Sequence, residues 1–197
     1  MNIILTVILF LSTLLLPLTL CAKDIPDALS IIHNRKSVRH FTGQAVAKED
    51  LEIILKAGMA APTAVNKQPW SFVVVTDRKD LDALAVVLPY AKMLDQAGAA
   101  IVVCAIPNQA FNGSAEFAII DSTCASENIL LAAEALGLGA LWTAVYPDKD
   151  RIKAVRDILN IPQEVIPLNV IPVGHPTGED KPKDKYKLEN IHWGKWS

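Results

Sequence analysis

Apolar side chains recur along the chain in two different periods. A repeat near 3.6 residues indicates one buried face of a helix, whereas short β-branched runs indicate strands. The helical repeat predicts helices over residues 24–35, 48–60, 80–88, 116–136 and 148–159. The β-branched runs predict strands over residues 71–76, 99–106, 140–145 and 165–173. This alternation, with one long helix among short elements, favours a layered α+β or α/β domain.

Two central segments indicate where the core lies. The run 99–106 (AAIVVCAI) is apolar throughout and bounded by Gly98 and Pro107, which predicts a strand buried on both faces. The long apolar helix at 116–136 is interrupted by Asp121, Glu127 and Glu134. Those charges argue against a membrane span and favour a central helix that other elements cover on most sides.

The two ends of the chain differ from this core. Residues 1–22 contain no charged side chain and end at Ala22, which predicts a signal peptide ahead of a single domain at 23–197. A membrane anchor over the same residues, or a lipid on Cys21, is the alternative. Each reading places the domain outside the cytoplasm, with the periplasm as first choice. Residues 174–197 have little apolar periodicity, which predicts an extended arm that docks on another surface.

Charge and cysteine content narrow the function classes. The chain has 19 Lys and Arg against 21 Asp and Glu, so no global basic field is available to hold a nucleic acid. Cys104 and Cys124 have neither the spacing of a metal site nor the short separation of a redox dithiol. Both are interpreted as small core residues, and a disulfide between them stays open.

Basic residues at alternate positions form the first candidate site. Arg35, Ser37 and Arg39 lie two residues apart where the first helical pattern ends. In an extended segment this spacing points the three side chains the same way, as a phosphate clamp would need. Lys183 and Lys185 repeat the spacing in the tail. Solvated surface cations are the alternative explanation for both groups.

The segment 61–70 (APTAVNKQPW) forms the second candidate site. Its two prolines restrict the backbone, and Thr63, Asn66 and Gln68 supply hydroxyl and amide groups. These features suit a binding loop. The alternative is a plain connection from helix to strand, with Trp70 packed in the core.

Five motifs together carry a resemblance to a known family. RKSVRHF, APTAVNKQPWSFVVV, ALGLGALW, IPVGHP and KPKDKY resemble the nitroreductase family of flavoproteins, in that family's own order. The resemblance spans about residues 30–187. It implies an α+β fold with a central, mostly antiparallel sheet flanked by helices. It also implies a homodimer that has the long central helix at its interface and two FMN sites between the subunits.

The resemblance assigns roles to single residues. Arg35, Ser37 and Arg39 are expected at the FMN phosphate and the pyrimidine edge, and Lys183 and Lys185 at the same phosphate. Four loop residues are expected to reach the flavin of the partner subunit: Pro62, Thr63, Ala64 and Asn66. Three further residues are expected along the ring itself: Gln68, Thr143 and Ala144.

The implied chemistry is electron transfer through the flavin. NADH or NADPH would reduce FMN and leave, and a small acceptor such as a quinone or nitroaromatic would then be reduced in a ping-pong cycle. Arg39, with Lys92 as a second candidate, would stabilise the anionic reduced flavin. His175 is interpreted as a turn residue.

Two alternatives to this chemistry stay open. The same fold serves other flavin reactions, such as reductive dehalogenation or flavin fragmentation. Because reduced nicotinamide is scarce outside the cytoplasm, a non-catalytic flavin-binding or flavin-carrying envelope protein is the second alternative.

Overall fold

The computed structural model describes residues 27–196. The predicted signal peptide or anchor at 1–22 lies outside these residues, as does the start of the predicted helix 24–35. That helix is observed as α1 (Ala28–Asn34). It begins after Asp27, whose side chain accepts a hydrogen bond of 3.0 Å from the Ser30 backbone N–H. This cap pairs an N–H that the first turn would otherwise leave unsatisfied.

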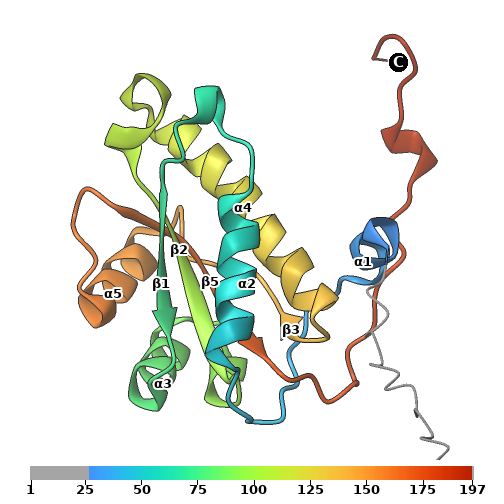
Figure 1. The fold of residues 1–197 in the computed structure, drawn as a ribbon. Coiled ribbons are helices and arrows are strands. Elements are labelled where there is room, and N and C mark those ends of the chain that lie inside the picture. Colours follow the sequence, from blue (N-terminus) through green and yellow to red (C-terminus); the bar gives the residue numbers. More distant parts are fainter. Residues whose placement is uncertain (1–26, 197) are drawn as a thin grey trace, which may run out of the picture.

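An antiparallel sheet with strand order β1-β2-β5-β3 forms the centre of the fold (Figure 1). Its strands are β1 (Trp70–Val75), β2 (Ala99–Ala105), β5 (Ile166–Gly174), β3 (Gly139–Ala140) and β4 (Thr143–Ala144), which also pairs with β5. Within residues 27–196, the single parallel contact is an isolated bridge between Ser37 and Ala140. The predicted α+β class with a mostly antiparallel sheet is therefore confirmed.

One predicted strand is not continuous. Instead of a single strand over 140–145, the structure has β3 and β4 separated by two residues. Both pair with β5 in the same register, which places Leu141 opposite Pro172. Proline has no backbone N–H to donate to a ladder. The interruption therefore coincides with the position where the partner strand lacks a donor.

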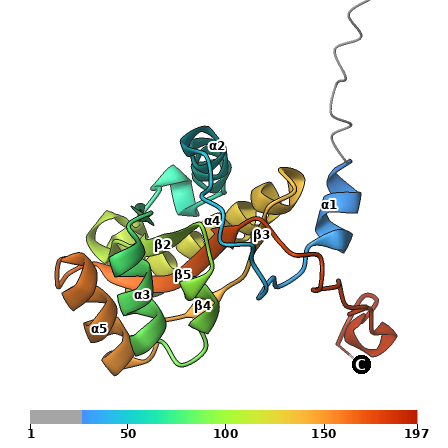
Figure 2. The same ribbon diagram turned by 90° about the horizontal axis from the view of Figure 1, so that it is seen from below.

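Helices cover both faces of the sheet (Figures 1 and 2). The helices on one face are α2 (Lys48–Met59) and α4 (Ala115–Ala135), and those on the other are α3 (Arg78–Val87) and α5 (Lys149–Leu159). Successive residues of β2 alternate between the two layers, with Val102 in one core and Ile101 and Val103 in the other. Every residue of β2 is buried, as the apolar run predicted.

The predicted central helix is α4, which packs against α2 and the sheet. Its first turn is capped by Ser114, whose hydroxyl accepts a hydrogen bond of 3.2 Å from the Phe117 backbone N–H. The close approach of α2 depends on Gly58, where a Cβ would lie 2.9 Å from Ile129 Cγ1. Among residues 27–196, no helix is both long and apolar enough to cross a bilayer.

Beyond β5 the chain continues as an extended arm that passes α1 (Figures 1 and 2). Residues 181–190 are exposed, and their regular structure is a short 3-10 turn, Leu188–Asn190. Trp193 and Trp196 are largely exposed. The prediction that this arm is extended is thus confirmed.

The two cysteines that the structure describes are free thiols. Cys104 is buried in β2, where burial raises the pKa of its thiol to about 12. Cys124 is half-buried on α4. The disulfide that the sequence left open is not formed.

Candidate functional site

The segment after α1 is extended and alternates between the core and the surface. Val38 donates a backbone hydrogen bond of 3.1 Å to the Ala140 carbonyl, and its side chain is 1% exposed. Ser37 and Arg39, on either side of it, are exposed. The packing of Val38 therefore turns its two neighbours outward, as the two-residue spacing predicted.

Three predicted cations meet beside α1. Arg35, Lys183 and Lys185 line one cavity of about 500 Å³. The other lining residues come from α1 and the tail: Ile32, His33, Pro182, Asp184 and Tyr186. The clustering of these cations from opposite ends of the described chain is a geometry suited to an anion with several negative charges.

An ion pair orients Arg35 within this group. Its Nε lies 3.2 Å from Glu127 Oε1 of α4. A guanidinium carries five N–H donors in a fixed plane, so one carboxylate contact leaves donors for a second anion. Glu127 thereby fixes the direction of the Arg35 side chain without neutralising the whole cavity, which also contains Lys183 and Lys185.

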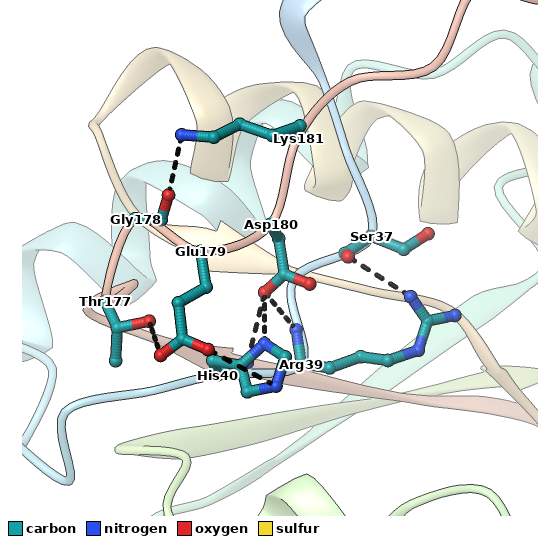
Figure 3. Close-up of polar contacts among 8 residues, drawn as sticks. All are labelled: Ser37, Arg39, His40, Thr177, Gly178, Glu179, Asp180 and Lys181. Atoms are coloured by element: carbon teal, nitrogen blue, oxygen red, sulfur yellow. Dashed lines mark hydrogen bonds and ion pairs between the residues drawn. The ribbon is translucent and has the colours of Figure 1, made fainter.

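Ser37 and Arg39 are outside the lining of that cavity. The Arg39 side chain lies along the extended segment, and its Nη1 donates a hydrogen bond of 3.3 Å to the Ser37 carbonyl (Figure 3). The five polar groups expected at one phosphate are therefore divided within a single chain: three line the cavity, and two lie beside it on the 35–39 segment.

The loop 61–70 has an unusual backbone. Val65, Asn66 and Gln68 have positive φ angles of 45°, 57° and 52°. Such angles are costly for residues other than glycine, and most of all for a β-branched one. Within the loop, Thr63 Oγ1 accepts a hydrogen bond of 3.1 Å from the Gln68 backbone N–H. The loop thus holds a strained conformation by bonds of its own.

A buried carboxylate from α4 also fixes this loop. Asp121 Oδ1 accepts a hydrogen bond of 3.2 Å from the Ala64 backbone N–H. The Asp121 residue is only 4% exposed, and its Oδ2 has no hydrogen-bond partner within residues 27–196. In the sequence, Asp121 is noticeable only as a charge that interrupts an apolar helix. Its contact with a loop 57 positions away leaves no local pattern.

The remaining predicted ring contacts lie on β4. Thr143 is buried, and its hydroxyl donates to the Val170 carbonyl. The next residue of β4, Ala144, is exposed. The loop carries Pro62, Asn66 and Gln68 at its surface, and Gln68 borders a separate cavity with Trp70 of β1.

Two further candidates have different surroundings. Lys92 opens a 3-10 turn, Lys92–Asp95, whose Leu94 packs in the core beneath α3, and it does not line the cavity beside α1. His175 follows β5, and its carbonyl accepts a hydrogen bond of 2.9 Å from the Thr42 N–H. No group of three or more His, Cys, Asp or Glu side chains in the described part of the chain is placed to hold a metal ion.

Comparison with known proteins agrees with this fold. The model of the nitroreductase family matches residues 32–88 and 84–175. A protein from Archaeoglobus fulgidus, named by inference as an NADH dehydrogenase/NAD(P)H nitroreductase, is 40% identical to this chain over 173 residues. The alignment covers 86% of this chain and 99% of that protein.

Solved structures give the same result. A crystal structure from Parabacteroides distasonis, with the same inferred name, is 47% identical with a TM-score of 0.82, covering 87% of this chain and 99% of that one. An FMN-dependent nitroreductase from Clostridium difficile is 26% identical with a TM-score of 0.78, covering 85% and 99%. The chain therefore belongs to the nitroreductase family.

Proposed function

We propose that this protein is an FMN-dependent oxidoreductase that takes electrons from NADH or NADPH and passes them to a small acceptor. The observation that carries the proposal is the cavity where Arg35, Lys183 and Lys185 meet. Family membership supports it, because similar proteins have names that specify FMN or NAD(P)H.

The residues of the cavity suit the phosphate of FMN. Arg35 offers a planar set of donors, and Lys183 and Lys185 add two mobile ammonium groups. Hydrogen bonds to charged groups are stronger than neutral ones, so these three cations favour a dianion even though Asp184 lines the same cavity and the protein is not basic overall. When bound, FMN would supply hydride chemistry at its ring, and the protein would supply its position and electrostatic surroundings.

We propose a homodimer because the predicted site residues of one chain lie in separate groups. The cavity beside α1 and the loop 61–70 do not share a lining in the single chain. In a dimer built along α4, the loop of one subunit would approach the flavin bound by the other. Large apolar side chains are exposed on α1, at Leu29 and Ile32, and on α4 itself, at Ile120, which supports such an interface.

The proposed reaction is ping-pong transfer at one face of the flavin, with a quinone-like or nitroaromatic acceptor. Backbone contacts at Thr143 and Ala144 would position the ring. Arg39 would stabilise negative charge at the pyrimidine edge, because its guanidinium lies at the exposed segment next to Ser37. A non-catalytic flavin carrier is the competing function, and it predicts bound FMN without turnover.

An absorbance spectrum of the purified protein, with identification of what it releases on denaturation, tests cofactor binding. The expected result is a flavin spectrum and released FMN. The double variant Lys183→Ala with Lys185→Ala should lose FMN, because each charge-assisted bond contributes about 1.5–3 kcal/mol. Lys48→Ala with Lys153→Ala removes two helix lysines elsewhere and should keep it. A protein that neither contains nor takes up FMN would overturn the proposal.

Steady-state oxidation of NADH and of NADPH, with a quinone or a nitroaromatic as acceptor, tests turnover. Oxidation of either nicotinamide that depends on the acceptor supports the oxidoreductase. Bound FMN that neither nicotinamide reduces would instead identify a flavin carrier.

We also propose that the domain is exported by residues 1–22. The lack of charge in that segment supports the proposal. Cell fractionation and the mass of the recovered protein test it. A periplasmic form beginning at Lys23 is expected, whereas a cytoplasmic form that retains Met1 would overturn it.

A further inference from the structure

The start of the tail pairs with the segment that follows the predicted phosphate clamp. Thr42 N–H donates a hydrogen bond of 2.9 Å to the His175 carbonyl, and Thr177 N–H donates one of 3.0 Å to the His40 carbonyl. Between these bonds, buried Phe41 faces Pro176 in an antiparallel bridge. The tail therefore leaves the sheet already attached to residues 40–42.

Asp180 makes the last of these attachments (Figure 3). Its Oδ2 accepts hydrogen bonds from the backbone N–H groups of Arg39, at 2.8 Å, and of His40, at 3.1 Å. The His40 ring nitrogen Nδ1 lies 3.2 Å from the same oxygen. One carboxylate oxygen thus ties the tail to two consecutive peptide groups and an imidazole.

The turn that presents Asp180 is closed by its own bonds. Gly178 has a φ of +94°, which glycine adopts easily. Lys181 Nζ donates a hydrogen bond of 2.8 Å to the Gly178 carbonyl, and Thr177 Oγ1 donates one of 3.1 Å to Glu179 Oε1. These contacts hold the Asp180 side chain toward the 39–40 backbone, so the turn is preorganised for this anchor.

Asp180 differs from its neighbour Glu179 in what it contacts. The Asp180 side chain is 15% exposed and bonds backbone groups, whereas the Glu179 side chain is 65% exposed and lies 3.8 Å from the His40 ring. Partial burial alone would raise the pKa of the Asp180 carboxyl, but the hydrogen bonds from Arg39 and His40 outweigh it and lower that pKa. Asp180 is therefore an ionised acceptor at neutral pH.

We propose that Asp180 is a positioning residue for the cofactor cavity. Lys183 and Lys185 follow it by three and five residues, so the Asp180 contacts lie directly ahead of them in the tail. By fixing the tail against residues 39 and 40, Asp180 sets where these lysines stand relative to Arg35, which begins the same segment. This inference rests on the proposed binding of FMN in that cavity.

The proposal predicts an effect opposite in sign to simple electrostatics. A carboxylate near a phosphate site repels the phosphate, so its removal should tighten binding if charge alone mattered. If Asp180 positions the tail, its removal frees the two lysines and weakens binding instead. The direction of the change in the FMN dissociation constant therefore separates the two roles.

Three variants of the full chain test this. Asp180→Ala removes the acceptor, Asp180→Asn keeps a neutral one, and Glu179→Ala removes the same charge one residue away. The expected FMN dissociation constant rises about tenfold for Asp180→Ala, corresponding to about 1.4 kcal/mol, rises less for Asp180→Asn, and stays level or falls for Glu179→Ala. An unchanged or tighter constant for Asp180→Ala would overturn the proposal.

Hydrogen exchange provides a readout that does not need the flavin. The backbone amides of Arg39 and His40 should exchange about tenfold faster in Asp180→Ala than in Glu179→Ala, because they lose their acceptor. If the wild type binds no FMN, the proposed function fails, while this exchange still shows whether Asp180 anchors the tail. Equal exchange rates in the two variants would overturn the anchor itself.

Discussion

Gly139 of β3 lies directly against Val38: a Cβ on this glycine would come within 2.6 Å of Val38 Cγ1. Because Val38 turns Ser37 and Arg39 outward, this contact sets the position of the segment between α1 and the sheet. Gly139→Ala should push Val38 away and lower the free energy of unfolding by about 1–3 kcal/mol, as overpacked cores do. Urea denaturation measures the change.

A double-mutant cycle provides the control for this contact. A Val38→Ala background removes Cγ1 and Cγ2, at 2.6 and 2.9 Å from the new methyl group, but keeps Cβ at 2.8 Å, so Gly139→Ala should cost less there without becoming neutral. Equal costs in the two backgrounds would show that the close approach of Gly139 and Val38 is unimportant.

The buried carboxylate of Asp121 is expected to support the loop 61–70 through a single oxygen. Asp121→Asn keeps an acceptor for the Ala64 N–H and removes a carboxylate oxygen, Oδ2, that has no hydrogen-bond partner within residues 27–196. It should be as stable as the wild type or more so. Asp121→Ala leaves that N–H without its acceptor and should cost about 1–3 kcal/mol, with faster hydrogen exchange at Ala64.

Urea denaturation and exchange on both Asp121 variants check this expectation. If Asp121→Asn is destabilised as much as Asp121→Ala, the charge rather than the acceptor is what the loop needs.

The anchor at Asp180 should make part of the stability depend on pH. Its pKa in the folded protein is below the ordinary value of 3.8. A carboxyl with a depressed folded pKa contributes stability that is present above its unfolded pKa and is lost as pH falls through the folded value. The difference in unfolding free energy between wild type and Asp180→Ala should therefore shrink as pH falls below 3.8.

Urea denaturation between about pH 5 and about pH 2 measures this difference. Repeating the comparison in a His40→Ala background excludes a contribution from titration of the ring that faces Asp180. Glu179→Ala serves as the control for loss of a nearby charge. A difference that grows on acidification contradicts the assignment.

Cys104 should be unreactive in the folded protein. Burial raises the pKa of its thiol from 9.0 to about 12, so only about one molecule in ten thousand carries the reactive thiolate at about pH 8. Peptide-level mass spectrometry after maleimide treatment is expected to find Cys124 labelled well before Cys104. In urea the two should react alike. Rapid labelling of Cys104 in the native protein would contradict its burial.

The fold was largely predictable because its elements have strong local signals. The apolar run at 99–106 indicated a strand buried on both faces, and β2 is that strand. The break between β3 and β4 was not predictable, because it coincides with Pro172 on a partner strand far along the chain. A ladder depends on both partners, whereas periodicity describes one.

The site shows the same division. Spacing and family resemblance identified Arg35, Lys183 and Lys185, which the structure brings together. Asp121 and Asp180 were missed as supporting residues because each accepts from backbone N–H groups, which every residue except proline possesses. A carboxylate that bonds a distant peptide group has no partner residue type by which the sequence could reveal it.

The cavity beside α1 draws Arg35 from one end of the described chain and Lys183 and Lys185 from the other. A ribosome makes these residues at opposite stages of synthesis, so a nascent chain that already contains α1 and the whole sheet still lacks the cavity. Products truncated before Lys183 would keep most of the core, but their cavity would lack two of its three cations. Retention on an immobilised phosphate ligand should therefore distinguish finished molecules from fragments that a test of secondary structure would accept.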